Sequence, residues 1–307
     1  MTFLDPRLTE RRNPRTTGID LASPLEIVDL INDEDATIPA AVRSQREEIA
    51  RAIEVAEATF RRGGRLFYVG AGTSGRLGVL DASEMPPTFG TDPEMVQGII
   101  AGGLAALTRS QEGAEDRVES AVEDLTSHGV RPGDFVIGIA ASGTTPYVRR
   151  ALAHAHTVGA ATALVACSPP SDEARHHADI LILPLTGPEV VTGSTRGKAG
   201  TATKLVLNTI TTGSMIRLGK TFGNLMVDLR ATNDKLRDRS ERIVMEIAGI
   251  DRQSAHDLLA RAGGVVKTAI VMQLLGVDRP EAERRLADHS GVIRRVVDHD
   301  PPPITGQ

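Results

Sequence analysis

The sequence predicts an α/β fold: a doubly wound, parallel five-stranded sheet with helices before it and a small all-helical module after it. Two observations predict this fold. Short apolar runs alternate with helical stretches through the middle of the chain, and the pattern becomes entirely helical beyond about residue 225. In a parallel sheet, the crossover helices cover both faces, and the buried strands are typically continuous apolar runs of this kind.

The apolar runs predict the strands, and the stretches between them predict the crossover helices. The strand runs are 65–70, 95–100, 134–141, 161–167 and 179–185. The helical stretches are 23–35, 39–62, 75–83, 103–127, 145–158, 171–177 and 197–218. Because ligands of parallel sheets bind beyond the carboxyl ends of the strands, we expect the site in the loops that follow these runs.

Changes of pattern along the chain predict its domain organisation. The expected parts are an N-terminal extension with helices over 1–55, the sheet domain over 56–219, a long connecting helix over 220–250, a small helical module over 251–300 and a disordered tail over 301–307. The module contains four short helical segments, three of which end at a glycine.

Composition excludes several classes of protein. The net charge of −5 argues against binding to nucleic acid or to an anionic membrane, which require a basic face. Cys167 is the only cysteine, so no internal disulfide is possible, and the histidines do not form a metal-binding set. No apolar stretch reaches the ~20 residues of a membrane span, and the first residues lack the apolar core of a signal peptide. We therefore expect a cytoplasmic protein without a metal.

The first strand run leads into the glycine pattern G-x-G-x-x-G at Gly70, Gly72 and Gly75, which is typical of a dinucleotide-binding turn. Such a turn also requires an acidic residue at the end of the second strand, where it binds the ribose hydroxyls. That strand ends in QGIIAGG, without an acid, so NAD is not favoured. The G-K-[ST] sequence of an ATP-binding loop is also missing from this loop.

Hydroxyl side chains follow the first and third strand runs. They are Thr73 and Ser74 in the first loop, and Ser142, Thr144 and Thr145 around Gly143 in the second. Each loop enters a helix N-terminus, where unpaired amides and the helix dipole favour an anion. Two such loops at neighbouring strand ends favour a phosphate monoester as ligand. The alternative is that these residues simply cap their helices.

A third segment, GPEVVTGSTRGKAGTATKLVLN, precedes the last long helix of the sheet domain. It places Glu189, Ser194, Arg196 and Lys198 before or at the helix start. Because cations at a helix N-terminus oppose its dipole, Arg196 and Lys198 are more readily explained by an anionic ligand. The alternative is a solvated surface.

These stretches resemble the N-acetylmuramic acid 6-phosphate etherase family. The resemblance rests on GAGTSGRLGVLDASEMPPTFG, IAGG, EGAED, GIAASGTTPYV, the third segment, FGNLMVDLRATNDKL and LTERRNPRTTGIDLASPLEIVDLINDED. It implies a sugar isomerase (SIS) domain of the flavodoxin-like type in a homodimer, and no cofactor. It also implies cleavage of the D-lactyl ether of N-acetylmuramate 6-phosphate during peptidoglycan recycling and amino-sugar catabolism, with N-acetylglucosamine 6-phosphate and D-lactate as products.

Matched by position, the family's catalytic carboxylates fall on Glu84 as proton donor and Glu115 as base, although the sequence leaves the reverse assignment open. The predicted substrate contacts are Gly72, Thr73, Ser74, Gly75, Ser83, Ser142, Gly143, Thr144, Thr145, Glu189, Ser194, Arg196 and Lys198. The chain departs from the family at Gly197, where relatives often carry Met or Leu, and at Ser168, where they often carry Asn. These two departures leave both carboxylates in place.

The residues themselves allow other interpretations. Glu115 lies in a predicted charged helix and could belong to a solvated face. Glu84 follows a predicted helix that is ~13 Å long, so it is expected to lie too far from its own phosphate loop to reach the sugar. We therefore expect an active site at the dimer interface. The alternative functions are an aldose–ketose sugar-phosphate isomerase and a regulator that senses sugar phosphates without catalysis.

Overall fold

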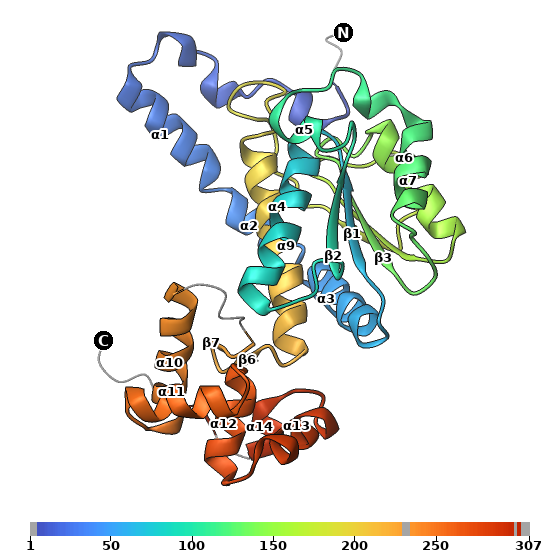
Figure 1. Cartoon of the computed structure of the whole chain (residues 1–307). Coiled ribbons are helices and arrows are strands. Elements are labelled where there is room, and N and C mark those ends of the chain that lie inside the picture. Colours follow the sequence, from blue (N-terminus) through green and yellow to red (C-terminus); the bar gives the residue numbers. More distant parts are fainter. Residues whose placement is uncertain (1–4, 229–233, 298–299, 302–307) are drawn as a thin grey trace. The chain divides into compact units, whose positions relative to one another are not determined.

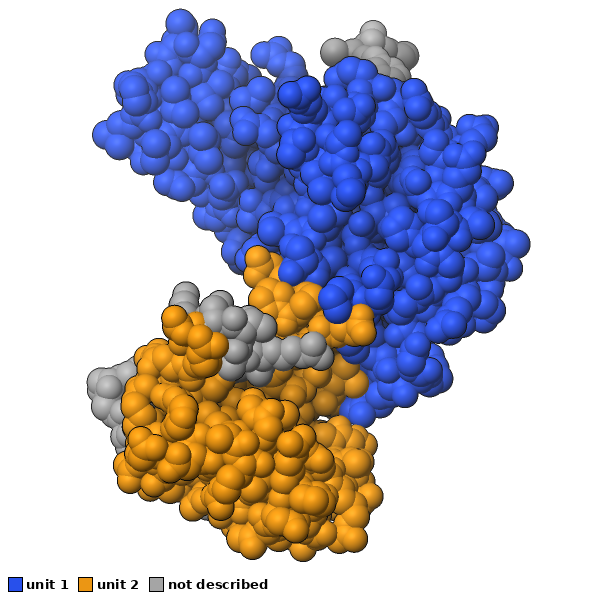
Figure 2. All heavy atoms as spheres, viewed as in Figure 1, with its two compact units in different colours: residues 1–83, 93–211 blue, residues 84–92, 212–307 orange. Residues whose placement is uncertain are grey.

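The computed structural model describes residues 5–228, 234–297 and 300–301 (Figure 1). The predicted disordered tail over 301–307 therefore lies, except for Pro301, outside the described residues. Contacts between residues divide the chain into two compact units (Figure 2). The first comprises residues 1–83 and 93–211, and the second comprises 84–92 and 212–307.

The first unit contains the predicted five-stranded parallel sheet, with strand order β2-β1-β3-β4-β5. The strands are β1 (Leu66–Gly70), β2 (Val96–Ile100), β3 (Phe135–Ile139), β4 (Ala161–Val165) and β5 (Ile180–Ile182). In this order the chain leaves β1 toward one edge and returns past it to β3. The fold class is therefore confirmed, including its flavodoxin-like strand order.

Helices cover both faces of the sheet because successive strand side chains point to opposite sides. Phe67 and Val69 pack with α6 (Val118–Ser127) and α7 (Pro146–Thr157) in one core cluster. Tyr68, between them, instead hydrogen-bonds Asp81 of α4 (Gly72–Phe89). The remaining helices of this unit are α1 (Pro24–Asp35), α2 (Ile38–Arg43), α3 (Arg46–Arg61), α5 (Ala105–Thr108), α8 (Asp172–His176) and α9 (Lys198–Arg217), along with short 3-10 turns.

Two helices predicted from the sequence are interrupted. The stretch 39–62 divides into α2 and α3, and the stretch 103–127 divides into α5, a 3-10 turn at Ala114–Asp116 and α6. Gly113, immediately before that turn, has a left-handed φ of 69°, which ends any continuous helix there. Glu115 consequently lies on a short turn between two helices, and not on the long charged helix that the sequence predicted.

Helix α4 is longer than the predicted stretch 75–83 and continues through Pro86 and Pro87. Its first turns lie directly against the sheet because they are rich in glycine. A Cβ added at Gly75 would lie 2.6 Å from a side-chain carbon of Ile100, so no other residue fits there without a shift. Glu84 is consequently an internal residue of the helix, and not the residue that follows its end.

The second unit is helical, with one small hairpin. It contains α10 (Asp234–Ala248), α11 (Arg252–Arg261), α12 (Val266–Leu275), α13 (Arg279–Asp288) and α14 (Ile293–Val297), which share one apolar core cluster. The predicted helix over 220–250 is shorter, because Gly223 and Asn224 form a two-residue turn between β6 (Thr221–Phe222) and β7 (Leu225–Met226).

Among the described residues, no single helix has both the length and the hydropathy of a membrane span. Helices α11 and α12 reach these values only together, across a bend of 107°.

Candidate active site

The two hydroxyl-rich loops lie at neighbouring strand ends. Gly70, the last residue of β1, is paired with Ile139, the last residue of β3. The first loop leads into α4, and the second leads through Ser142–Thr145 into α7. This is the point where the strand order reverses, which is where ligands of open α/β sheets bind.

The second loop is held in a defined shape by its own side chains. The hydroxyls of Ser142 and Thr144 lie 2.9 Å apart, and the Thr144 amide donates to Ser142 Oγ at 3.3 Å. Gly143 has a left-handed φ of 72°, and an added Cβ there would lie 2.7 Å from Pro170 Cα. Thr145 occupies the N-cap position of α7, but its side chain makes no capping hydrogen bond. Capping therefore does not explain the Thr145 hydroxyl.

A pocket of about 190 Å³ brings the first loop together with Glu115. It is lined by Ala71, Gly72, Arg76, Ala101, Ala106 and the segment Ser110–Glu115. All of these residues belong to the first unit. The structure thus places one of the two predicted catalytic carboxylates beside the predicted phosphate loop. The second hydroxyl loop does not line this pocket.

Glu84 lies far along α4 from the phosphate loop. It comes twelve residues after Gly72, which corresponds to about 18 Å along the helix axis at ~1.5 Å per residue. Its side chain is exposed, as is that of Ser83, whose hydroxyl donates to Leu80 O at 2.8 Å. Glu84 is the first residue of the second unit, whereas the phosphate loop belongs to the first unit.

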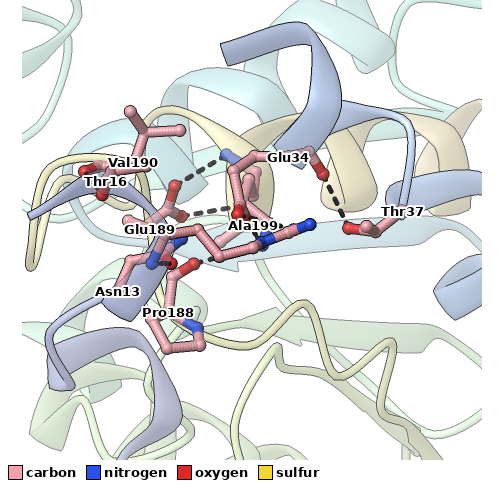
Figure 3. Close-up of polar contacts among 10 residues, drawn as sticks. Asn13, Thr16, Glu34, Thr37, Pro188, Glu189, Val190 and Ala199 are labelled. Carbon is pink, nitrogen blue, oxygen red and sulfur yellow. Dashed lines mark hydrogen bonds and ion pairs between the residues drawn. The ribbon is translucent and has the colours of Figure 1, made fainter. Parts of the chain in front are cut away.

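The third segment meets an internal anion at the start of α9 (Figure 3). Lys198 Nζ donates to the buried carboxylate of Glu34 at 2.5 Å and to Pro188 O at 3.1 Å. The Arg15 guanidinium lies 2.6 Å from the same carboxylate. The anion that Lys198 contacts is therefore part of the protein, an outcome that differs from both the predicted ligand and the solvated surface.

Glu189 is also committed to internal contacts. Its buried carboxylate accepts hydrogen bonds from the backbone amides of Lys198 at 2.8 Å and Ala199 at 2.9 Å, which are the first two amides of α9 (Figure 3). A Cβ at Gly197 would lie 2.8 Å from Glu189 Oε2, so glycine leaves room for this approach. These contacts favour a structural role for Glu189 and Lys198 over the predicted substrate contacts. Ser194 is half-buried and Arg196 is exposed.

The pKa values of these two carboxyls shift in opposite directions, although burial acts to raise both. Burial raises the pKa of Glu189, and hydrogen bonds from the amides of Ala199 and Lys198 only partly offset it. Burial also acts to raise the pKa of Glu34, but hydrogen bonds from Lys198 and Asn13 outweigh it and leave that pKa below its usual value. Glu34 is therefore held ionised by Lys198.

Among the described residues, no group of three or more His, Cys, Asp or Glu side chains is arranged to hold a metal ion. Cys167 is buried, and burial raises the pKa of its thiol to about 12.

Comparisons with known proteins show the family of this chain. The profile of the glucokinase regulatory protein N-terminal SIS domain matches residues 48–156. An N-acetylmuramic acid 6-phosphate etherase of Rhodopirellula baltica is 55% identical, over 87% of this chain and 88% of its own. The etherase of Mycolicibacterium smegmatis is 53% identical, over 85% of this chain and 88% of its own. The chain belongs to the N-acetylmuramic acid 6-phosphate etherase family.

Among solved structures, the phosphoheptose isomerase of Neisseria gonorrhoeae is 16% identical, over 61% of this chain and 96% of its own, with a TM-score of 0.46.

Two buried or half-buried charges of this etherase-family chain were missed by sequence reasoning. Arg76 lines the pocket, and its only sequence signal is its position one turn after Gly72. Asp81 accepts hydrogen bonds from Tyr68 OH at 2.9 Å, Asn208 Nδ2 at 2.5 Å and Thr211 Oγ1 at 3.2 Å. Burial raises the pKa of Asp81, and its contacts join β1, α4 and α9. An acid within the apolar stretch GVLDA was the available signal.

Proposed function

We propose that this etherase-family protein cleaves N-acetylmuramate 6-phosphate in the pocket beside α4. This sugar phosphate is the one in the name of its relatives. The chain is a carbon–oxygen lyase of this family, at more than half identity to several members. The observation that carries the proposal is the common pocket of Glu115 and Gly72, because it joins a candidate base to an anion-binding helix start. The products would be N-acetylglucosamine 6-phosphate and D-lactate.

The 6-phosphate would bind at the two hydroxyl-rich loops. Among the described residues, none makes a hydrogen bond to the amides of Gly72, Thr73 or Ser74 in the first turn of α4. Unpaired amides at a helix start bind phosphate oxygens, and the helix dipole adds to the attraction. Ser142 and Thr145 from the neighbouring loop supply further hydroxyls.

The reaction would be an elimination followed by addition of water. An alkyl ether is a poor leaving group for direct displacement, but the carbonyl of the open-chain sugar acidifies the proton at C2. A carboxylate removes this proton, the C3–O bond breaks, and a carboxylic acid protonates the departing lactate oxygen. Water then adds to the unsaturated aldehyde at C3 and C2, which restores the hydroxyl and the C2 proton.

We assign Glu115 as the base and Glu84 as the acid. Glu115 lies beside the phosphate loop. Glu84 lies about 18 Å along α4 from Gly72, too far for one sugar phosphate to span readily (~1.5 Å per residue). We therefore infer a homodimer in which Glu84 acts on the sugar bound by the partner subunit. Glu84 is exposed, and so is Leu80 one turn before it, an apolar side chain with an exposed fraction of 51%. This exposure supports a surface that a partner subunit would cover.

We place the protein in the cytoplasm and in the recycling of peptidoglycan amino sugars, because its proposed substrate is a phosphorylated cell-wall sugar. An isomerase acting on the same substrate class would yield a ketose and no lactate, and a regulator would yield neither.

The deciding experiment is incubation of the protein with N-acetylmuramate 6-phosphate in water enriched in ¹⁸O. Elimination and hydration place the label in the hydroxyl at C3 of the sugar product. Label in lactate would contradict this mechanism, and the absence of lactate would contradict the function itself.

The shared site has a separate test. Chains carrying Glu84→Gln are mixed with chains carrying Ser74→Glu, and the mixed dimers are isolated by two affinity tags. Activity is measured at a substrate concentration near the wild-type KM, where each parent variant is expected to be nearly inactive. One intact site per mixed dimer is expected, with up to half of the wild-type activity. Mixed dimers no more active than their parents would contradict the sharing.

A further inference from the structure

We propose that Arg76 is a positioning residue for Glu115, because it fastens the segment 102–117 to the helix that carries the phosphate loop. This inference rests on the proposed function for its catalytic consequence, but the fastening itself can be tested without substrate.

The contact is made by two nitrogens of one guanidinium. Arg76 Nε donates to Leu107 O at 3.0 Å, and Arg76 Nη2 donates to Ala106 O at 2.6 Å. Both carbonyls belong to α5 (Ala105–Thr108), the single turn of helix that opens the segment. The last carbonyls of a helix lack partners within it, so a cation is favoured at this end.

Few other hydrogen bonds connect the segment to the rest of the described chain, although its turn Ala114–Asp116 packs against α7. Its other hydrogen bonds are local, such as Ala114 N to Gln111 O, Asp116 N to Gly113 O and Ser110 Oγ to Glu112 Oε1. Among the described residues, only Arg76 donates to it or accepts from it over a long sequence separation. Packing adds Ala106, which is buried, and Ala114, which lies against the core cluster.

Arg76 links the helix that carries the phosphate loop to the segment that carries the proposed base. It lies one helical turn after Gly72 on α4, and it lines the same pocket as Gly72, Ala106 and Glu115. Its two hydrogen bonds need the fixed fork of a guanidinium, which a lysine ammonium does not reproduce. The third nitrogen, Nη1, makes no hydrogen bond with the described residues.

The consequence falls on turnover more than on binding. A base must lie within hydrogen-bond reach of the proton that it removes, and a misplacement of about 1 Å costs on the order of 10²-fold in rate. Thr73 and Ser74, the proposed phosphate contacts of the first loop, lie outside the segment 102–117. Loss of Arg76 should therefore lower kcat and leave KM almost unchanged.

Arg65 provides a matched control in the same unit. Its Nη1 donates to His128 O at 3.1 Å and its Nη2 donates to Gly129 O at 2.6 Å, just after α6. This guanidinium also contacts the end of a helix. Because Arg65 precedes β1, it lies at the N-terminal ends of the parallel strands, whereas the pocket lies at their C-terminal ends. Loss of Arg65 should lower stability without a selective effect on kcat.

The experiment compares lactate release by wild-type protein, Arg76→Ala and Arg65→Ala. For Arg76→Ala we expect kcat to fall about 100-fold with KM within about threefold, and partial recovery on addition of guanidinium chloride far below unfolding concentrations. For Arg65→Ala we expect a lower Tm, kcat near wild type and no response to guanidinium. An unchanged kcat in Arg76→Ala, or a loss that guanidinium does not restore, would overturn the inference.

Hydrogen exchange of the substrate-free proteins tests the fastening independently of any activity. Amides of residues 102–117 should exchange faster in Arg76→Ala than in wild type, and they should be unchanged in Arg65→Ala. Equal exchange in all three would overturn the inference, whereas a wild-type protein that releases no lactate would overturn only the proposed function. If Arg76→Ala does not fold, Arg76→Lys replaces it. We then expect kcat to fall about tenfold, because the compact ammonium group does not reproduce the two hydrogen bonds of the guanidinium.

Discussion

Helices α4 and α9 begin side by side, but their first turns differ in what their amides contact. A Cβ added at Gly200, in the first turn of α9, would lie 3.7 Å from Thr73 Cγ2, in the first turn of α4. The amides of Lys198 and Ala199 donate to Glu189, whereas the described residues make no hydrogen bond to the amides of Gly72–Ser74. One helix start is filled by an internal carboxylate, and the other is open to a ligand.

This difference shows that a helix start with nearby charged and hydroxyl residues is not by itself an anion-binding site. Both starts were predicted from the sequence to bind an anion, α4 from its hydroxyls and α9 from Arg196 and Lys198. The start of α9 is closed by a carboxylate nine residues earlier in the chain and by the pair of Lys198 with Glu34. Only the start of α4 has both unpaired amides and a pocket with a candidate base.

The largest effect that would test this comparison is expected from Lys198→Met. The variant leaves the carboxylate of Glu34, which is 2% exposed, without its buried partner. The free energy of unfolding should fall by about 3 kcal/mol, measured by urea denaturation, because breaking a buried ion pair is costly and only the exposed Arg15 remains as a cationic partner. The matched control is Lys204→Met, an exposed lysine on the same helix, with a change within about 0.5 kcal/mol.

The comparison would fail if Lys198→Met left stability near wild type and raised KM for the sugar phosphate instead. That result would make Lys198 the substrate contact that the sequence predicted.

The next effect is expected from filling the open start of α4. Ser74→Glu places a carboxylate in the first turn of α4, as Glu189 does for α9, and a negative charge there repels the phosphate while favouring the helix dipole. The dissociation constant for the sugar phosphate should rise about 100-fold, or about 2.7 kcal/mol, measured by calorimetry, with Tm unchanged or higher. Ser74→Ala, which adds no charge, should cost about tenfold. Unchanged affinity in Ser74→Glu would place the phosphate elsewhere.

The smallest effect is expected from Glu189→Gln. Because the amide side chain presents one donor where the carboxylate had an acceptor, one α9 amide loses its partner, and stability should fall by about 2 kcal/mol with KM within about threefold. The exposed Glu173→Gln is the control. A KM increase of tenfold or more without loss of stability would restore Glu189 as a substrate contact.

The same variant carries a pH signature. Burial raises the pKa of Glu189 in the folded protein above its usual 4.5, so the folded state binds more protons than the unfolded state above that pH. The wild-type stability contributed by this group therefore falls as the pH rises from 4.5 through the folded pKa. The stability difference between wild type and Glu189→Gln should narrow over this interval, and a difference that widens would contradict the raised pKa.

The sequence by itself determined the sheet, the hydroxyl-rich loops, the family and the presence of Glu84 and Glu115. These features are local, because apolar runs, glycine-hydroxyl loops and long shared strings are all read from neighbouring residues. Gly113 was a local signal too, yet the pattern alone did not show that its left-handed φ breaks the helix before Glu115.

Tertiary structure alone decided which helix start is open and which carbonyls Arg76 contacts. Glu34 and Lys198 are 164 residues apart, and Arg76 reaches Ala106 across 30 residues. Helical and strand periodicity is set by neighbours along the chain, whereas the partner of a buried charge is set by which segments fold against each other. For that reason the sequence indicated anion binding at both α4 and α9, and the fold assigned Lys198 to the carboxylate of Glu34.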